Sequence, residues 1–163
     1  MTSSPIICCR KIGFDSGHRV VNHESKCRTF HGHRYTAEIY ACANQLDDLG
    51  RVIDFSVIKE KIGGWIDTYW DHTMIINKDD PDRGVIEDLS GYKEPFILDY
   101  NPTAENMALF LLHDVCPNLL ADTNIEVVRI KLWETPNCFA EVSKPIISDP
   151  DINEDVVQVH EEI

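Results

Sequence analysis

The chain has 163 residues, of which 43% are hydrophobic, and its formal net charge is −13. This length suits one domain with an ordinary hydrophobic core. The acidic balance argues against a nucleic-acid-binding protein, because phosphate backbones require a basic footprint. No apolar run reaches the roughly eighteen residues that a membrane span needs, so we expect no membrane segment.

Cysteine usage and local charge add two expectations. The six cysteines are scattered without a C-x-x-C pair, and the N-terminus lacks a long apolar segment, so we expect reduced cysteines in a cytoplasmic protein. Residues 1–35 carry six Lys or Arg against two acidic residues, while the rest carries nine basic and twenty-six acidic residues. This basic region suits a small anionic substrate, although plain solvation of a strand–loop–strand segment explains it equally well.

The first predicted elements are strands. Residues 6–17 read as a strand with imperfect alternation, and residues 19–30 read as a polar loop. Residues 33–43 alternate clearly between two faces, which is typical of a strand. After a turn, Val52–Ile53 resumes briefly as a strand.

A helix is predicted next, over residues 55–70. Asp54 is a suitable N-cap, and the apolar side chains recur at helical spacing. Residues 71–77 leave this helix, and the polar, turn-rich residues 78–94 read as a long loop.

The second half of the chain repeats these elements in reverse. A helix capped by Thr103 is predicted over residues 104–115, with its end near Pro117. Residues 125–134 read as a strand, and after a turn CFAEVS returns as another.

The resulting order, ββααββ, predicts an α+β fold: a four-stranded antiparallel sheet with two helices on one face. Such a sheet has two open edges, which proteins usually cover or pair. We assign residues 1–145 to this domain. Residues 146–163 carry six acidic residues and no Lys or Arg, and we expect them to form an appended acidic tail.

The chemistry concentrates in KCRTFHGHRY, residues 26–35. His31 and His33 are separated by one residue, so in an extended segment both imidazoles face the same side. With His18 as a third ligand, they would make a three-histidine zinc site with an open position, which is typical of catalytic zinc. Cys27 is better placed as a base or nucleophile than as a fourth ligand. The alternative is that these are surface histidines on a solvated strand.

The motifs F-x-x-x-H at 14–18 and C-x-x-x-H-G-H at 27–33 resemble those of the pterin synthases of the tunnel fold. That family includes 6-pyruvoyltetrahydropterin synthase and 6-carboxytetrahydropterin synthase, the latter in queuosine biosynthesis. The three-residue gap between Cys27 and His31 is similar to that of the bacterial 6-carboxy enzyme. The resemblance covers residues 5–144.

The resemblance implies roles for further residues. DHTMIIN at 71–77 resembles a family segment whose Asp and His share proton transfer with the cysteine, and this implies catalytic roles for Cys27, Asp71 and His72. Taken alone, Asp-His is an ordinary helix end. The remaining implied residues bind substrate: Glu134 for the pterin ring, Thr103 and Glu105 at the start of the second helix, and Lys26 and Arg28 for the triphosphate. Without the family, Glu134 would read as a surface residue and Thr103 as a helix cap.

The function implied is a zinc-dependent lyase that converts 7,8-dihydroneopterin triphosphate to 6-carboxytetrahydropterin, with loss of triphosphate and acetaldehyde. The family also implies a homohexamer, a dimer of trimers, with active sites between subunits. Three alternatives stay open: the pyruvoyl enzyme, which keeps the carbon chain; a protein that binds zinc and pterin without turnover; and a metal hydrolase with another substrate.

Overall fold

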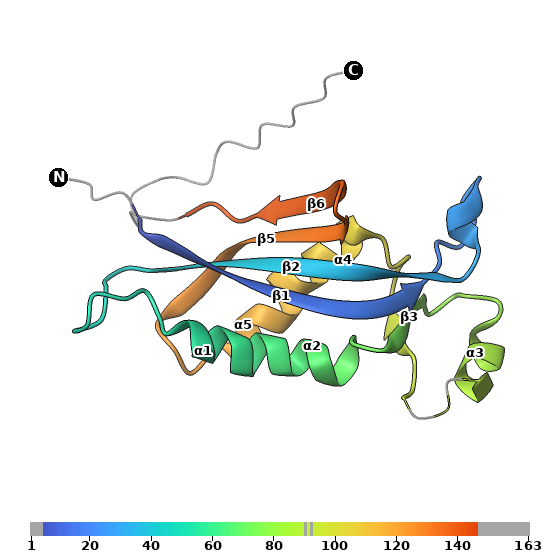
Figure 1. Ribbon diagram of the computed structural model, residues 1–163, viewed down its shortest axis with the longest axis horizontal. Coiled ribbons are helices and arrows are strands. Elements are labelled where there is room, and N and C mark those ends of the chain that lie inside the picture. Colours follow the sequence, from blue (N-terminus) through green and yellow to red (C-terminus); the bar gives the residue numbers. More distant parts are fainter. Residues whose placement is uncertain (1–4, 90, 92, 147–163) are drawn as a thin grey trace, which may run out of the picture.

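The segments predicted as strands at residues 6–17, 33–43 and 125–134 form the three longest strands of the sheet. In the computed structural model, which describes residues 5–89, 91 and 93–146, β1 (Ile7–His18) and β2 (His31–Ala43) pair antiparallel along their length. β5 (Ile125–Thr135) pairs antiparallel with β2, and β6 (Cys138–Ser143) with β5. These four strands confirm the antiparallel part of the prediction. The β1–β2 connection lies at one end of the sheet, near β3 and α3 (Figure 1).

Within the described ranges the sheet has six strands and is mixed, so the prediction of a four-stranded antiparallel sheet is wrong in number. β3 (Thr73–Asn77) pairs parallel with β1, β4 (Phe96–Leu98) pairs parallel with β3, and the strand order is β4-β3-β1-β2-β5-β6. Both strands are too short to display alternation, and a parallel partner reached through a crossover leaves no local pattern. The predicted strand at Val52–Ile53 is absent.

Each of the two predicted helices is continuous but contains a π-helical turn. The first runs through α1 (Phe55–Ile58), η2 (Lys59–Gly63) and α2 (Gly64–Tyr69), and the Asp54 side chain accepts a hydrogen bond from the Ser56 amide. The second runs through α4 (Ala104–Phe110), η3 (Leu111–Val115) and α5 (Cys116–Leu119). It continues past Pro117, where the sequence predicted its end, because the π turn shifts the hydrogen-bond register ahead of the proline.

Two shorter elements lie in segments predicted as loops. The 3-10 turn η1 (Lys26–Arg28) lies in the β1–β2 connection, and α3 (Arg83–Leu89) lies within the predicted loop of residues 78–94.

Both long helices cover the same face of the sheet, as predicted. One cluster of buried side chains joins them to the strands: Phe14, Tyr35, Ile39, Ile58, Ile62, Ile66, Met107 and Leu111 all have no exposed area. Burying a side chain of this size stabilises the fold by about 1.5–3 kcal/mol. The face with this core also carries His18 and His33 at its end, because they continue the alternation of Phe14 and Tyr35.

The predicted acidic tail lies, except for Ile146, outside the described residues, so the boundary after residue 145 stays a prediction. In the described ranges, no helix has the length and apolar character needed to cross a membrane.

Candidate metal centre and active site

The strand register brings the three predicted histidines together at the end of the sheet. His18 lies directly opposite His31 across β1 and β2, and His33 lies opposite Ser16. Their ligand nitrogens all lie within 4.8 Å of one another. The grouping predicted from the sequence therefore exists in the fold.

Hydrogen bonds orient two of these rings. His18 Nδ1 lies 2.7 Å from the Pro102 carbonyl oxygen, and His31 Nδ1 lies 2.6 Å from the Thr29 carbonyl oxygen. Since a carbonyl can only accept, each Nδ1 carries the proton, and each Nε2 presents its lone pair. Carbonyl partners of this kind are usual behind metal-bound histidines.

Burial gives the cluster the character of a metal site. The Nε2 atoms of His18 and His33 are buried and have no hydrogen-bond partner among the described residues. A buried nitrogen without a partner is unfavourable unless another group satisfies it. Burial also lowers the pKa of both imidazoles and outweighs the opposing effect of Glu134, which favours the neutral form that binds metal. The donor set fits a divalent metal ion.

Glu134 lies beside this cluster. Its Oε1 is 3.5 Å from His18 Nε2 and 3.8 Å from His33 Nε2. The pairing of β5 with β6 shifts register between Trp133 and Thr135, so Glu134 is the extra residue of a bulge. Glu134 continues the alternation of the buried Ile130 and Leu132, so its carboxylate lies on the same side of the sheet as the histidines. The sequence placed Glu134 only at a pocket rim.

Cys27 lies in η1, in the connection between the two histidine-bearing strands. Its thiol is free and half-buried, and its carbonyl oxygen accepts a hydrogen bond of 2.9 Å from the Val20 amide. The neighbouring Lys26 and Arg28 side chains are exposed. The structure thus holds Cys27 on an ordered turn with two cations beside it in sequence.

Asp71 and His72 follow α2 and bond to each other and to β1. Asp71 accepts from the Asp15 amide at 2.8 Å, and its other oxygen lies 2.6 Å from His72 Nδ1. Burial raises the pKa of the Asp71 carboxyl, but these bonds outweigh it, and the pKa lies below its usual value. His72 has a positive φ of 54° and is 74% exposed. A non-glycine residue in this region is uncommon and often functional.

The described chain does not bring all predicted catalytic residues together. His72 lines an open hollow of about 500 Å³, which it shares with Asp15, Arg34 and Lys93 and with His33 of the cluster. Asp15 and Arg34 alternate with the histidines along β1 and β2, so their side chains face the opposite side of the sheet. Among the described residues, no hydrogen bond or ion pair joins Cys27 to Asp71 or His72.

The two predicted residues of the second helix lie at its start. The Thr103 side chain accepts a hydrogen bond of 3.3 Å from the Asn106 amide and caps α4, whereas Glu105 is exposed in the first turn. Sequence reasoning missed Pro102 and Thr29, which act through carbonyl oxygens that every residue has. It also missed Asn101, whose side chain bonds to the backbone of Val21 after His18. The only local signal for this residue is an asparagine before Pro-Thr.

Comparisons with known proteins agree with this arrangement. A family profile described as 6-pyruvoyl tetrahydropterin synthase matches residues 7–145. The 6-carboxy-5,6,7,8-tetrahydropterin synthase of Rickettsia conorii is 47% identical over 138 residues, which cover 84% of this chain and 99% of that protein. The protein of the same name from Aquifex aeolicus is 29% identical, over 78% of this chain and 91% of its own length.

Solved structures show the same fold at low sequence identity. An uncharacterized protein from Wolinella succinogenes superposes with a TM-score of 0.73 at 22% identity, covering 86% of this chain and 99% of that one. The 6-pyruvoyl tetrahydropterin synthase of Plasmodium falciparum superposes with a TM-score of 0.63 at 20% identity, covering 87% and 99%.

Proposed function

The chain belongs to the 6-pyruvoyl tetrahydropterin synthase family, and from this premise we propose that it is a zinc-dependent 6-carboxytetrahydropterin synthase. The substrates would be 7,8-dihydroneopterin triphosphate and one water molecule, and the products 6-carboxytetrahydropterin, triphosphate and acetaldehyde. Four Rickettsia proteins with the carboxy name, 46–47% identical over 99% of their length, support this product over the pyruvoyl one. The pathway would then be that of queuosine, in the cytoplasm, where the six free cysteines stay reduced.

The observation that carries the proposal is the convergence of His18, His31 and His33 with their Nε2 atoms beside the Glu134 carboxylate. Three neutral imidazoles would hold zinc and leave a position for substrate. A bound zinc ion would supply Lewis acidity to the hydroxyl groups of the substrate side chain.

The other residues of the chain would bind the substrate and move protons. Glu134 would accept two N–H bonds from the pterin ring in parallel, and its place beside the histidines would set the side chain over the metal site. Cys27 would remove a carbon-bound proton as a thiolate, and Lys26 and Arg28 would receive the triphosphate. Asp71 would orient His72, which would transfer the second proton.

The position of His72 supports an active site shared between subunits. The His72 side chain is 74% exposed and lines an open hollow, and no hydrogen bond or ion pair among the described residues joins it to Cys27, which leaves room for a residue of a second chain in this group. We propose the homohexameric tunnel-fold assembly, a dimer of trimers, in which β4 and β6 are edge strands available for pairing. Thr103 and Glu105 would complete the pterin pocket.

A second candidate is the pyruvoyl enzyme, which eliminates triphosphate but keeps the carbon chain. The description of the matching family profile favours it. The two reactions differ in the mass of the pterin product.

The test is incubation of the purified, zinc-loaded protein with 7,8-dihydroneopterin triphosphate, followed by mass spectrometry of the pterins. We expect 6-carboxytetrahydropterin, and we expect the activity to disappear with a chelator and return with zinc. The Cys27→Ala variant is the matched control, since it should keep the metal but form no product. A pyruvoyl product would favour the second candidate, and unchanged substrate would contradict both.

A further inference from the structure

The connection between β1 and β2, residues 19–30, is held by side chains of residues outside the metal centre. It begins directly after His18, ends directly before His31, and carries Cys27. Although it is polar and mostly irregular, the structure fixes it at its beginning, its middle and its end.

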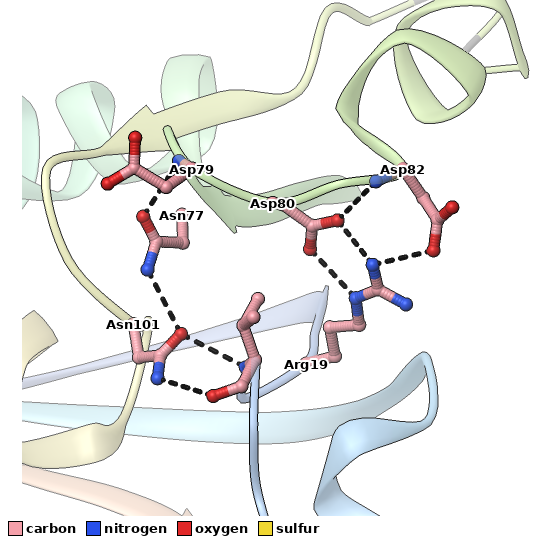
Figure 2. Close-up of polar contacts among 7 residues, drawn as sticks. Arg19, Asn77, Asp79, Asp80, Asp82 and Asn101 are labelled. Atoms are coloured by element: carbon pink, nitrogen blue, oxygen red, sulfur yellow. Dashed lines mark hydrogen bonds and ion pairs between the residues drawn. The ribbon is translucent and has the colours of Figure 1, made fainter.

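The first anchor is an ion pair between Arg19 and Asp80 (Figure 2). The Asp80 carboxylate accepts from Arg19 Nε at 2.7 Å and from Nη2 of the same guanidinium. The Asp80 side chain has no exposed area, and that of Arg19 is 13% exposed. The Asp82 amide also donates to Asp80, at 2.9 Å. A two-point pair between a guanidinium and a carboxylate fixes orientation as well as distance.

The same guanidinium reaches the far end of the connection. Arg19 Cζ lies 4.1 Å from the centroid of the Phe30 ring, which is typical of a cation–π contact. Arg19 therefore links the first residue of the connection to the last one. Both lie next to histidines of the metal centre.

The second anchor is Asn101, which precedes the proline behind His18. Its Oδ1 accepts from the Val21 amide at 3.0 Å, and its Nδ2 donates to the Val21 carbonyl at 3.0 Å. This side chain thus pairs with Val21 as a neighbouring strand would. Asn77 Nδ2 donates to Asn101 Oδ1 at 3.1 Å and ties the amide to the end of β3 (Figure 2).

Cys27 is bonded to the residue between these two anchors. The Val20 amide donates to the Cys27 carbonyl, and Val20 lies between Arg19, held by Asp80, and Val21, held by Asn101. A displacement at either anchor passes to the Cys27 backbone through this one hydrogen bond. Asp80 and Asn101 come from segments 50 or more residues away in the sequence, so they attach this turn to distant parts of the fold.

We propose that Asp80 and Asn101 are positioning residues that hold Cys27 in place in the connection between the two histidine-bearing strands. This inference rests on the proposed function, in which Cys27 removes a proton from the substrate. It adds two residues that act through the backbone of the connection, since Asp80 bonds to Arg19 and Asn101 bonds to Val21.

The test compares Asp80→Asn and Asn101→Ala with Asp82→Asn as the matched control. Asp82 accepts from the same Arg19 guanidinium at 2.7 Å, but its side chain is 55% exposed, so its loss should leave the anchor in place. Three quantities are measured on each full-length protein: zinc content, kcat and KM, and the rate at which iodoacetamide alkylates Cys27. Peptide mass spectrometry reads that rate relative to the exposed Cys138.

We expect both anchor variants to keep stoichiometric zinc and a KM close to that of the unmodified protein. Their kcat should fall about 10- to 100-fold, as is usual when the support of a reacting group is lost. Alkylation of Cys27 should become several-fold faster relative to Cys138, because the turn opens. Asp82→Asn should match the unmodified protein in all three quantities.

The two claims fail in different ways. Alkylation does not depend on turnover, so an inactive unmodified protein would contradict the proposed function and leave the positioning of Cys27 to the alkylation result. Unchanged Cys27 alkylation in both anchor variants would overturn the positioning role, and so would a fall in kcat that follows a loss of zinc. If Asp80→Asn does not fold, Asn101→Ala decides the question, since it leaves the buried ion pair intact.

Discussion

Removal of one metal-binding imidazole should abolish the rise in melting temperature that zinc causes. It should change the melting temperature of the metal-free protein little. His33→Ala is the most informative variant, because His33 Nε2 is buried without a partner among the described residues. Truncation therefore removes an unsatisfied nitrogen rather than an intramolecular hydrogen bond. We expect the melting temperature of the metal-free variant to lie near that of the metal-free parent.

The magnitude follows from ligand linkage. At a free zinc concentration about 100 times the dissociation constant, binding stabilises the native state by about 2.7 kcal/mol. For a chain of this size, 1 kcal/mol shifts the melting temperature by about 2–4 °C. Zinc should therefore raise the melting temperature of the parent by about 5–11 °C. With two of three donors left, His33→Ala should show little or no shift at the same zinc concentration.

The assay is thermal unfolding with and without zinc, together with zinc analysis of the dialysed proteins. His113→Ala is the control, since His113 is an exposed histidine outside the cluster. A His33→Ala variant that keeps stoichiometric zinc and the full shift would refute the assignment of the metal centre.

Three further predictions concern single carboxylates and the thiol. Cys27→Ala should keep zinc and bind substrate but lose turnover; loss of zinc on metal analysis would instead make Cys27 a ligand. Glu134→Gln should weaken binding of sepiapterin about 100-fold or more in calorimetric titration, because it loses one charge-assisted bond and sets a donor against a donor. Equal affinities would contradict the role of Glu134 in pterin binding. Burial raises the pKa of Asp80, but bonds from Arg19 and the Asp82 amide outweigh it and lower the pKa. Asp80 then stabilises the fold above the unfolded pKa of about 3.9 and loses this contribution as the pH falls through the lower folded pKa. The difference in unfolding free energy between the parent and Asp80→Asn should therefore become smaller below about pH 4. Denaturant titrations at several pH values measure it, and a difference that stays the same at low pH would argue against this role of Asp80.

The sequence was sufficient where local pattern decides the structure. Alternation predicted β2, and the same alternation puts His31 and His33 on one side. His18 joins them because β1 and β2 pair in a register that sets it opposite His31.

The rest depends on contacts between distant segments. β3 and β4 form strands because they pair with parallel neighbours. At five and three residues, they are too short to show an alternation of their own. The Pro102 carbonyl behind His18 and the bulge at Glu134 are backbone features, which residue identity does not encode. The link between Arg19 and Asp80 spans 61 positions and could not be separated from ordinary surface charges.

The proposed metal centre and the proposed shared active site both act on the side chain of the substrate. The most direct measurement is therefore the amount of acetaldehyde and of triphosphate released by the zinc-loaded protein from 7,8-dihydroneopterin triphosphate in the same reaction. We expect equal amounts of the two, with neither released by Cys27→Ala. Triphosphate released without acetaldehyde, or no release of either, would contradict this expectation.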